Sequence, residues 1–160
     1  MTKINTHVAI DSAHILNCPY DTPCNNLHGH RWEIDIELKG VTNEQTGMLI
    51  DFSTIKAYFK RLDHSFIISN FTYRKLIEPI KDSDFIKRLN IFILPGDAEP
   101  TAENLARIWA NDIIKLKGHD NIKSVEINVA ETPNNTAAIK VFKLTQEEQG
   151  QKEPEGNVLQ

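Results

Sequence analysis

The chain has 160 residues, of which 40% are hydrophobic and 25% are charged, and its formal net charge is −4 at pH 7. This composition is typical of a single soluble globular domain, and the acidic balance argues against nucleic acid or an anionic membrane surface as a partner. A phosphorylated small molecule remains open as a ligand, because a few local cations suffice to bind one. The N-terminus has no signal-peptide pattern and no apolar run approaches the ~18 residues of a membrane-spanning helix, so we expect a cytoplasmic protein.

Two segments near the N-terminus, residues 3–11 and 31–39, alternate between apolar and polar side chains. This period of two is the pattern of strands that bury one face and solvate the other, as in antiparallel sheets. Residues 17–29 between them are rich in Pro, Asn and Gly, which predicts a loop. We therefore expect the two strands to pair as a hairpin.

Two further segments space their apolar residues as helices do. The first covers about residues 54–62, with Ser53 as its N-terminal cap. The second opens at Thr101, which is also a capping residue, and Gly118 is expected to stop it. Both helices are amphipathic, so each should cover one face of the sheet.

The remaining sequence completes an α+β domain. Residues 65–94 are expected to mix helix and loop, with a strand at their end, and two more strands are predicted at 124–131 and 137–144. Four long strands and two helices predict a four-stranded antiparallel sheet with both helices on one face. Residues 1–144 would form this domain, whereas the polar residues 145–160 are expected to be a disordered tail.

Three histidines form the first candidate site. His28 and His30 are two residues apart at the start of the second strand, so their side chains share the face of Trp32. His14, at the end of the first strand, comes near them if the hairpin forms. Three imidazoles can hold tetrahedral zinc and leave a fourth position open, which is the arrangement of a catalytic site. The alternative is that these histidines only make hydrogen bonds in the core. His7 is expected on the solvated face.

Two other polar residues are placed to act beside this cluster. Cys24 lies four residues before His28, and its thiolate would be favoured by a nearby cation. A small buried cysteine and a fourth zinc ligand are the alternatives for Cys24. Glu131 ends an inward apolar row, where an unpaired carboxylate would be costly, so a ligand with adjacent N–H donors is expected to satisfy it.

Six short motifs give the protein a resemblance to the 6-pyruvoyltetrahydropterin synthase family over about residues 3–142. Each motif is weak alone, but all six occur in the family's order. They are SAHIL at 12–16, C-x3-HGH at 24–30, GMLIDF at 47–52, LDH at 62–64, PTAEN at 100–104 and ET at 131–132. The three residues between Cys24 and the HGH motif resemble the carboxy-forming bacterial branch more than the pyruvoyl-forming enzymes.

The resemblance implies a fold and an assembly. Family members adopt the tunnelling fold, in which the sheets of several subunits join into a barrel with active sites at subunit interfaces. A homo-oligomer is therefore expected, and a hexamer by resemblance. A sheet of four long strands also leaves edges unpaired, which makes oligomerisation physically reasonable.

The resemblance also implies residue roles. His14, His28 and His30 would be the ligands of a Zn²⁺ cofactor. Cys24, Asp63 and His64 would share the proton transfers, and Glu131 would anchor the pterin ring with a contribution from Thr101. Asp63 and His64 are adjacent on a predicted helix end, where side chains diverge, so we expect no direct hydrogen bond between them. For the triphosphate the candidates are Arg31, Lys56 and Lys60.

The activity implied is that of a zinc-dependent lyase in queuosine biosynthesis. It would convert 7,8-dihydroneopterin triphosphate to 6-carboxy-5,6,7,8-tetrahydropterin, acetaldehyde and triphosphate. One alternative is a pyruvoyl-forming synthase that eliminates triphosphate and leaves the carbon–carbon bond of the substrate's side chain unbroken. Another is a pterin- or metal-binding protein without turnover.

Overall fold

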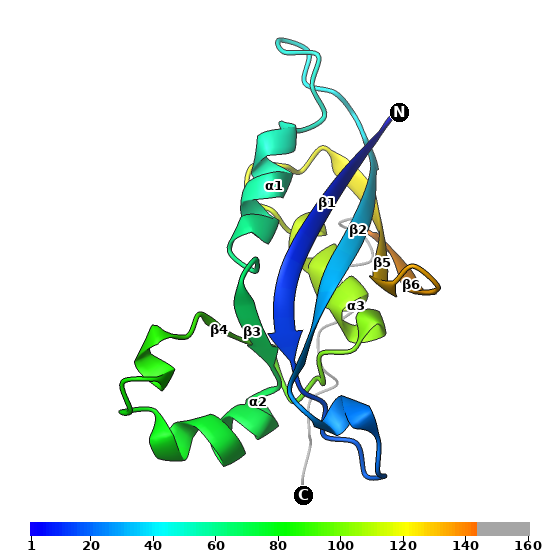
Figure 1. Cartoon of the computed structure of the whole chain (residues 1–160). Helices are drawn as coiled ribbons and strands as arrows, with labels where there is room; N and C mark the ends of the chain where they lie inside the picture. Colours follow the sequence, from blue (N-terminus) through cyan, green and yellow to red (C-terminus); the bar gives the residue numbers. More distant parts are fainter. Residues whose placement is uncertain (144–160) are drawn as a thin grey trace, which may run out of the picture.

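The structure, a computed structural model that describes residues 1–143, is built around a long antiparallel hairpin (Figure 1). The hairpin belongs to a six-stranded sheet with the strand order β4-β3-β1-β2-β5-β6. Strands β5 and β6 continue the antiparallel pairing beyond β2, whereas β3 and β4 are short and parallel to β1. The strands are β1 (Thr2–His14), β2 (His28–Gly40), β3 (Ser65–Ile68), β4 (Ile91–Ile93), β5 (Ile122–Thr132) and β6 (Asn135–Phe142).

Two amphipathic helices, α1 (Phe52–Lys60) and α3 (Ala102–Ile114), cover one face of this sheet (Figure 1). Their apolar stripes pack against the even-numbered side chains of β1 and β2 and the odd-numbered side chains of β5. Trp32 and Trp109 are both fully buried in this core. Burial of these faces, rather than helix propensity, holds the two layers together.

Between β3 and β4 the backbone makes an excursion of short helical turns. They are α2 (Asn70–Thr72), the π-helical turn η2 (Tyr73–Ile77) and the 3₁₀ turns η3 (Glu78–Ile80) and η4 (Ile86–Arg88). This segment has a small apolar cluster of its own, separate from the main core. A third 3₁₀ turn, η1 (Pro23–Asn25), lies in the loop between β1 and β2.

The four long strands, the strand near residues 90–94 and the two covering helices are confirmed. The expectation of a purely antiparallel four-stranded sheet is wrong, because the short strands β3 and β4 add parallel pairing beside β1. Short apolar pieces inside irregular sequence carry too little periodicity to reveal this. The predicted tail at 145–160 lies outside the described residues.

The helix ends also differ in detail from the prediction. Asp51, rather than Ser53, caps α1, and its carboxylate accepts the N–H of Ser53 over 2.7 Å. A carboxylate is favoured there because it also meets the positive end of the helix dipole. Thr101 caps α3 as predicted, but the helix ends at Ile114 and Gly118 lies in the turn that follows, with φ +79°. Among residues 1–143, no helix has the length and apolar character needed to cross a membrane.

Candidate metal centre and active site

The hairpin register brings three histidines together. His14 pairs directly with His28 across β1 and β2, and His30 follows two residues later on the same face. His14 is 1% exposed, and His28 and His30 are half-buried at the end of the core. The ring centroids of the three imidazoles lie 4.3 to 5.1 Å apart. The predicted histidine cluster is therefore formed within one subunit.

Glu131 of β5 completes this cluster. One ligand atom from each of His14, His28, His30 and Glu131 can be chosen so that all four lie within 4.8 Å of one another. The carboxylate oxygen Oε1 of Glu131 lies 2.9 Å from Nε2 of His30 and 3.9 Å from Nε2 of His14. Glu131 thus faces the histidines, as its place at the end of the inward row of β5 predicts.

Backbone carbonyls select the neutral tautomer of two of these rings. Nδ1 of His14 lies 2.8 Å from the carbonyl oxygen of Pro100, and Nδ1 of His28 lies 2.7 Å from that of Asn26. A carbonyl oxygen only accepts, so each Nδ1 must donate, and in the neutral ring the lone pair then resides on Nε2. Both Nε2 lone pairs are directed into the cluster.

The resulting arrangement is rich in electron pairs. The Nε2 atoms of His14 and His28 lie 2.9 Å apart, and the buried Nε2 of His30 has Oε1 of Glu131 at 2.9 Å but not in the geometry of a hydrogen bond. Protonation of His14 and His30 is disfavoured, because burial lowers the pKa of His14 to about 4 and also lowers the pKa of His30. Three imidazoles and a carboxylate that converge in this way have the chemistry of a site that could hold a metal ion.

Cys24 lies in the loop that flanks the cluster. Its carbonyl oxygen accepts the N–H of Leu16, two residues beyond His14, over 2.9 Å. Asn26, two residues after Cys24, supplies the carbonyl that orients His28. The thiol is free and half-buried, and among the described residues it is not a member of the four-residue cluster. The backbone of this loop is therefore bonded both to the segment that follows His14 and to the ring of His28.

Thr101 is placed by its capping role. Its hydroxyl accepts the N–H of Asn104 over 3.3 Å at the start of α3. The residue before it, Pro100, orients His14, so the cap lies one residue from a contact of the cluster. The structural part of the prediction for Thr101 is confirmed.

Asp63 and His64 do contact each other, so the expectation that their side chains diverge is wrong. Nδ1 of His64 lies 3.0 Å from Oδ2 of Asp63. The helix ends at Lys60, before both residues, and His64 has φ +55°, so the divergence expected of neighbouring helical side chains does not apply here. Asp63 also accepts the N–H of Asp11 over 2.9 Å, and this bond is the main cause that lowers the pKa of Asp63.

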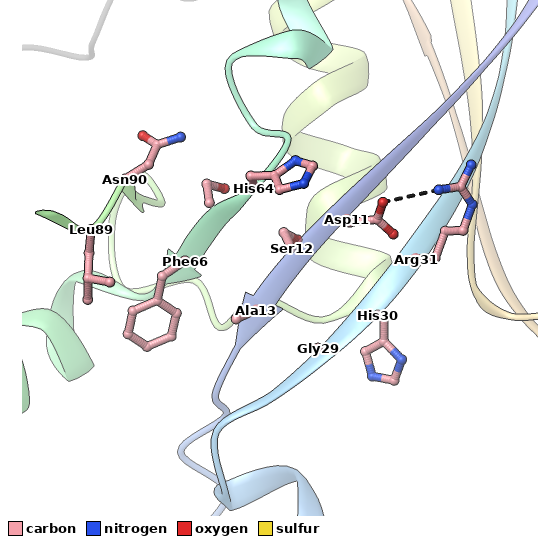
Figure 2. Close-up of a pocket in the computed structure, with 11 residues that line it drawn as sticks. Asp11, Ser12, Ala13, Gly29, His30, Arg31, His64, Phe66, Leu89 and Asn90 are labelled. Atoms are coloured by element: carbon pink, nitrogen blue, oxygen red, sulfur yellow. Dashed lines mark hydrogen bonds and ion pairs between the residues drawn. The ribbon is translucent and has the colours of Figure 1, made fainter.

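His64 lines a cleft of about 610 Å³ that adjoins the solvated face of β1 and β2 and is shown in Figure 2. One member of the histidine cluster, His30, lines the same cleft. The odd-numbered residues Asp11, Ala13, Gly29 and Arg31 lie on this face. In Figure 2 the ring of His30 points away from His64, with the hairpin between them. Within one subunit His64 thus shares a cleft with His30, but the two rings do not face each other.

The three cations considered for the triphosphate differ in position. Lys56 and Lys60 are exposed on α1. Arg31 forms ion pairs with Asp11 at 3.1 Å and with Glu33 at 3.0 Å. Arg31 also lines a hollow of about 470 Å³ that includes Glu131, which places it nearer to the cluster's carboxylate side.

Sequence patterns did not reveal the groups that orient these histidines. These are the carbonyls of Pro100 and Asn26, together with Glu99, which binds neighbouring segments through its carboxylate. Backbone carbonyls leave no signature in a sequence. The only available signal is general: a metal-binding histidine usually donates its second ring nitrogen to such a group.

Known proteins resemble this one in sequence and in fold. The profile of 6-pyruvoyl tetrahydropterin synthase matches residues 3–141. The 6-carboxy-5,6,7,8-tetrahydropterin synthase of Haemophilus influenzae is 30% identical over 141 residues, covering 83% of this protein and 94% of that one. The protein of the same name from Rickettsia conorii is 29% identical over 140 residues, covering 84% and 96%.

Solved structures agree at the level of the fold. The crystal structure of 6-pyruvoyl tetrahydropterin synthase from Plasmodium vivax superposes with a TM-score of 0.61 at 20% identity, covering 89% of this protein and all of that one. The Caenorhabditis elegans enzyme of that name gives 0.55, covering 88% and 95%. The profile match spans nearly all of the described residues, and the chain belongs to the 6-pyruvoyl tetrahydropterin synthase family.

Proposed function

We propose that this protein is a zinc-dependent 6-carboxy-5,6,7,8-tetrahydropterin synthase of queuosine or other 7-deazapurine biosynthesis. Its substrate would be 7,8-dihydroneopterin triphosphate, and its products 6-carboxytetrahydropterin, acetaldehyde and triphosphate. The convergence of His14, His28, His30 and Glu131 carries the proposal. Further support comes from the spacing of Cys24 before the HGH motif and from the names of the relatives at about 30% identity.

The three histidines would hold the zinc ion. Two carbonyls keep the Nε2 lone pairs of His14 and His28 available, and burial keeps His14 neutral. Zinc bound there would lower the pKa of the substrate's side-chain hydroxyls and stabilise developing negative charge. The fourth ligand position must stay open for this chemistry, so we assign Glu131 to the substrate rather than to the metal.

Glu131 would anchor the pterin. Its side chain is 28% exposed and lines the 470 Å³ hollow, so a ligand can reach it. The 2-amino and N3 groups of a pterin present two adjacent N–H donors, which match the two oxygens of a carboxylate. Thr101 contributes through the helix end that it caps, and Arg31 is the best placed of the three cations to meet the triphosphate.

Cys24, Asp63 and His64 would move the protons. A thiolate at Cys24 removes a proton from the reacting carbons of the substrate, and His64 serves as the partner acid or base, oriented by Asp63 at 3.0 Å. Because the ring of His30 points away from His64 although both residues line one cleft, the complete site would take its His64 from a second subunit. We therefore propose a homo-oligomer in which subunit sheets join into a barrel, with a hexamer as the expected assembly.

One experiment separates this function from its rivals. The purified protein is incubated with 7,8-dihydroneopterin triphosphate and Zn²⁺, and the products are identified by mass spectrometry. Acetaldehyde together with carboxytetrahydropterin supports the proposal. Pyruvoyltetrahydropterin would instead assign the protein to the triphosphate-eliminating branch, and unchanged substrate that co-purifies with the protein would indicate a pterin-binding protein without turnover.

A further inference from the structure

Glu99 joins several segments beside the metal centre. Its carboxylate accepts the N–H of Asn17 at Oε2 over 3.0 Å and the hydroxyl of Ser69 at Oε1 over 2.9 Å. Its carbonyl oxygen accepts the N–H of Thr101 over 2.8 Å and the side-chain amide of Asn104 over 2.9 Å. One residue thus connects the loop after β1, the end of β3 and the first turn of α3.

The environment of this carboxylate indicates a geometric role. Glu99 is half-buried, and Ser69 is completely buried. In the part of the protein that the structure describes, no Lys, Arg or His forms an ion pair with Glu99. A carboxylate so placed depends on hydrogen-bond donors for its stabilisation, and bonds from neutral donors to a charged acceptor are short and strong.

Two short routes lead from Glu99 to the candidate site. The residue after it, Pro100, accepts the Nδ1–H of His14 over 2.8 Å and so orients a metal ligand. On the other side, Asn17 follows Leu16, whose N–H is bonded to the carbonyl of Cys24 over 2.9 Å. The position of Glu99 therefore affects both the imidazole of His14 and the loop that holds the thiol.

We propose that Glu99 is a positioning residue that couples the His14 ligand to the loop of Cys24. It acts by hydrogen bonding, through Pro100 on one side and Asn17 on the other, and it touches neither metal nor substrate. The inference rests on the metal centre proposed above. It adds a residue outside the histidine and cysteine motifs to the machinery of that centre.

The hydrogen-bond pattern predicts which substitutions are tolerated. In Glu99→Gln, the amide oxygen can still accept from Asn17, while the amide NH₂ donates to the Ser69 hydroxyl. Ser69 then turns its own proton toward Thr72, whose Oγ1 already lies 3.0 Å away. Glu99→Ala removes the hydrogen bonds to both Asn17 and Ser69, so that only solvent can accept the N–H of Asn17. Gln should therefore preserve the geometry that Ala destroys.

The test compares Glu99→Ala and Glu99→Gln with wild type and with the control Asp97→Ala. Asp97 lies two residues earlier in the same loop and pairs with Arg74 at the surface, with its side chain 64% exposed. Metal affinity is measured by titration with Co²⁺ followed by its visible absorption. The reactivity of Cys24 is measured as its rate of alkylation by iodoacetamide in metal-free protein, by mass spectrometry of the Cys24 peptide. Thermal unfolding is recorded for every variant.

In Glu99→Ala we expect Co²⁺ affinity to fall by about tenfold, as for loss of an outer-shell partner, and Cys24 alkylation to become faster. Glu99→Gln and Asp97→Ala should match wild type in both measurements. Wild-type affinity and alkylation in a folded Glu99→Ala variant would overturn the inference, as would equal losses in Gln and Ala. If wild type itself binds no Co²⁺ or Zn²⁺, the proposed metal centre fails instead, and the two failures are thereby distinguished.

Discussion

The imidazole of His14 donates from Nδ1 to the carbonyl oxygen of Pro100, 86 residues further along the sequence, over 2.8 Å. This bond ties the last residue of β1 to the residue before the cap of α3. It also leaves the lone pair of Nε2 directed at His28 and the carboxylate of Glu131. The ligand geometry is therefore set by the hairpin and the covering helix together.

Removal of one histidine should remove the metal. In His28→Ala we expect zinc affinity to fall by more than the roughly 10–100-fold that loss of an outer-shell partner costs. The zinc content per subunit is measured by inductively coupled plasma mass spectrometry after dialysis. His7→Ala is the matched control, because His7 is an exposed histidine on the other face of the same hairpin. Unaltered zinc in His28→Ala would refute the three-histidine site.

Cys24→Ala should abolish turnover while its zinc content stays at the wild-type level. The reason is that Cys24 is assigned to proton transfer and lies outside the four-residue cluster. Product formation and zinc content are measured on the same preparation, with Cys18→Ala as the control in the same loop. Zinc loss in Cys24→Ala would make the thiol a ligand and contradict its role as a base.

Glu131→Gln distinguishes a pterin anchor from a metal ligand. Loss of charged hydrogen bonds of this kind costs about 1.5–3 kcal/mol, so the Kd for a dihydropterin should rise by about ten- to a hundredfold. Zinc content should be unchanged, because the three histidines remain. Calorimetric titration with dihydroneopterin measures the first quantity. A fall in zinc with unchanged pterin affinity would reverse the assignment.

Mixed oligomers test whether His64 serves a neighbouring subunit. Cys24→Ala and His64→Ala should each be inactive alone. When the two variants are unfolded, mixed and refolded together, about a quarter of the sites in a randomly mixed symmetric oligomer receive both intact residues. Recovery of activity toward that fraction is the expected result. If the mixture stays inactive although mass spectrometry shows mixed assemblies, His64 acts within its own subunit.

His7 gives a pH prediction that is independent of the metal. Its hydrogen bond to Asp35 is the main cause that raises its pKa above 6.5, and Glu33 adds to it while burial opposes it. Because the folded pKa exceeds the unfolded one, protonated His7 stabilises the protein below about pH 6.5, and this stabilisation is lost as the pH rises through the folded pKa. Asp35→Asn should lower the pKa of His7 measured by NMR titration. An unshifted titration would show that the ion pair does not form in solution.

Much of the candidate site could be predicted from local patterns. The alternation of β1 and β2 placed His14, His28 and His30 on one face, and the inward row of β5 placed Glu131 beside them. These inferences succeed because strand geometry repeats every two residues, so parity in the sequence becomes position on a face. The parallel strands β3 and β4 could not be found in this way, because short strands in irregular sequence have no such repeat.

By itself, the sequence determined the hairpin, the covering helices, the residues of the histidine cluster and the family motifs. Only the tertiary structure decided the tautomers of the rings, because the carbonyl of Pro100 reaches His14 from 86 residues away and that of Asn26 meets His28 only in the folded loop. Tertiary structure also decided that His64 contacts Asp63 and that it shares a cleft with His30, with a positive φ at His64 that no motif specifies. Local periodicity encodes which residues face inward, whereas the contacts that orient a catalytic group depend on segments far apart in the sequence.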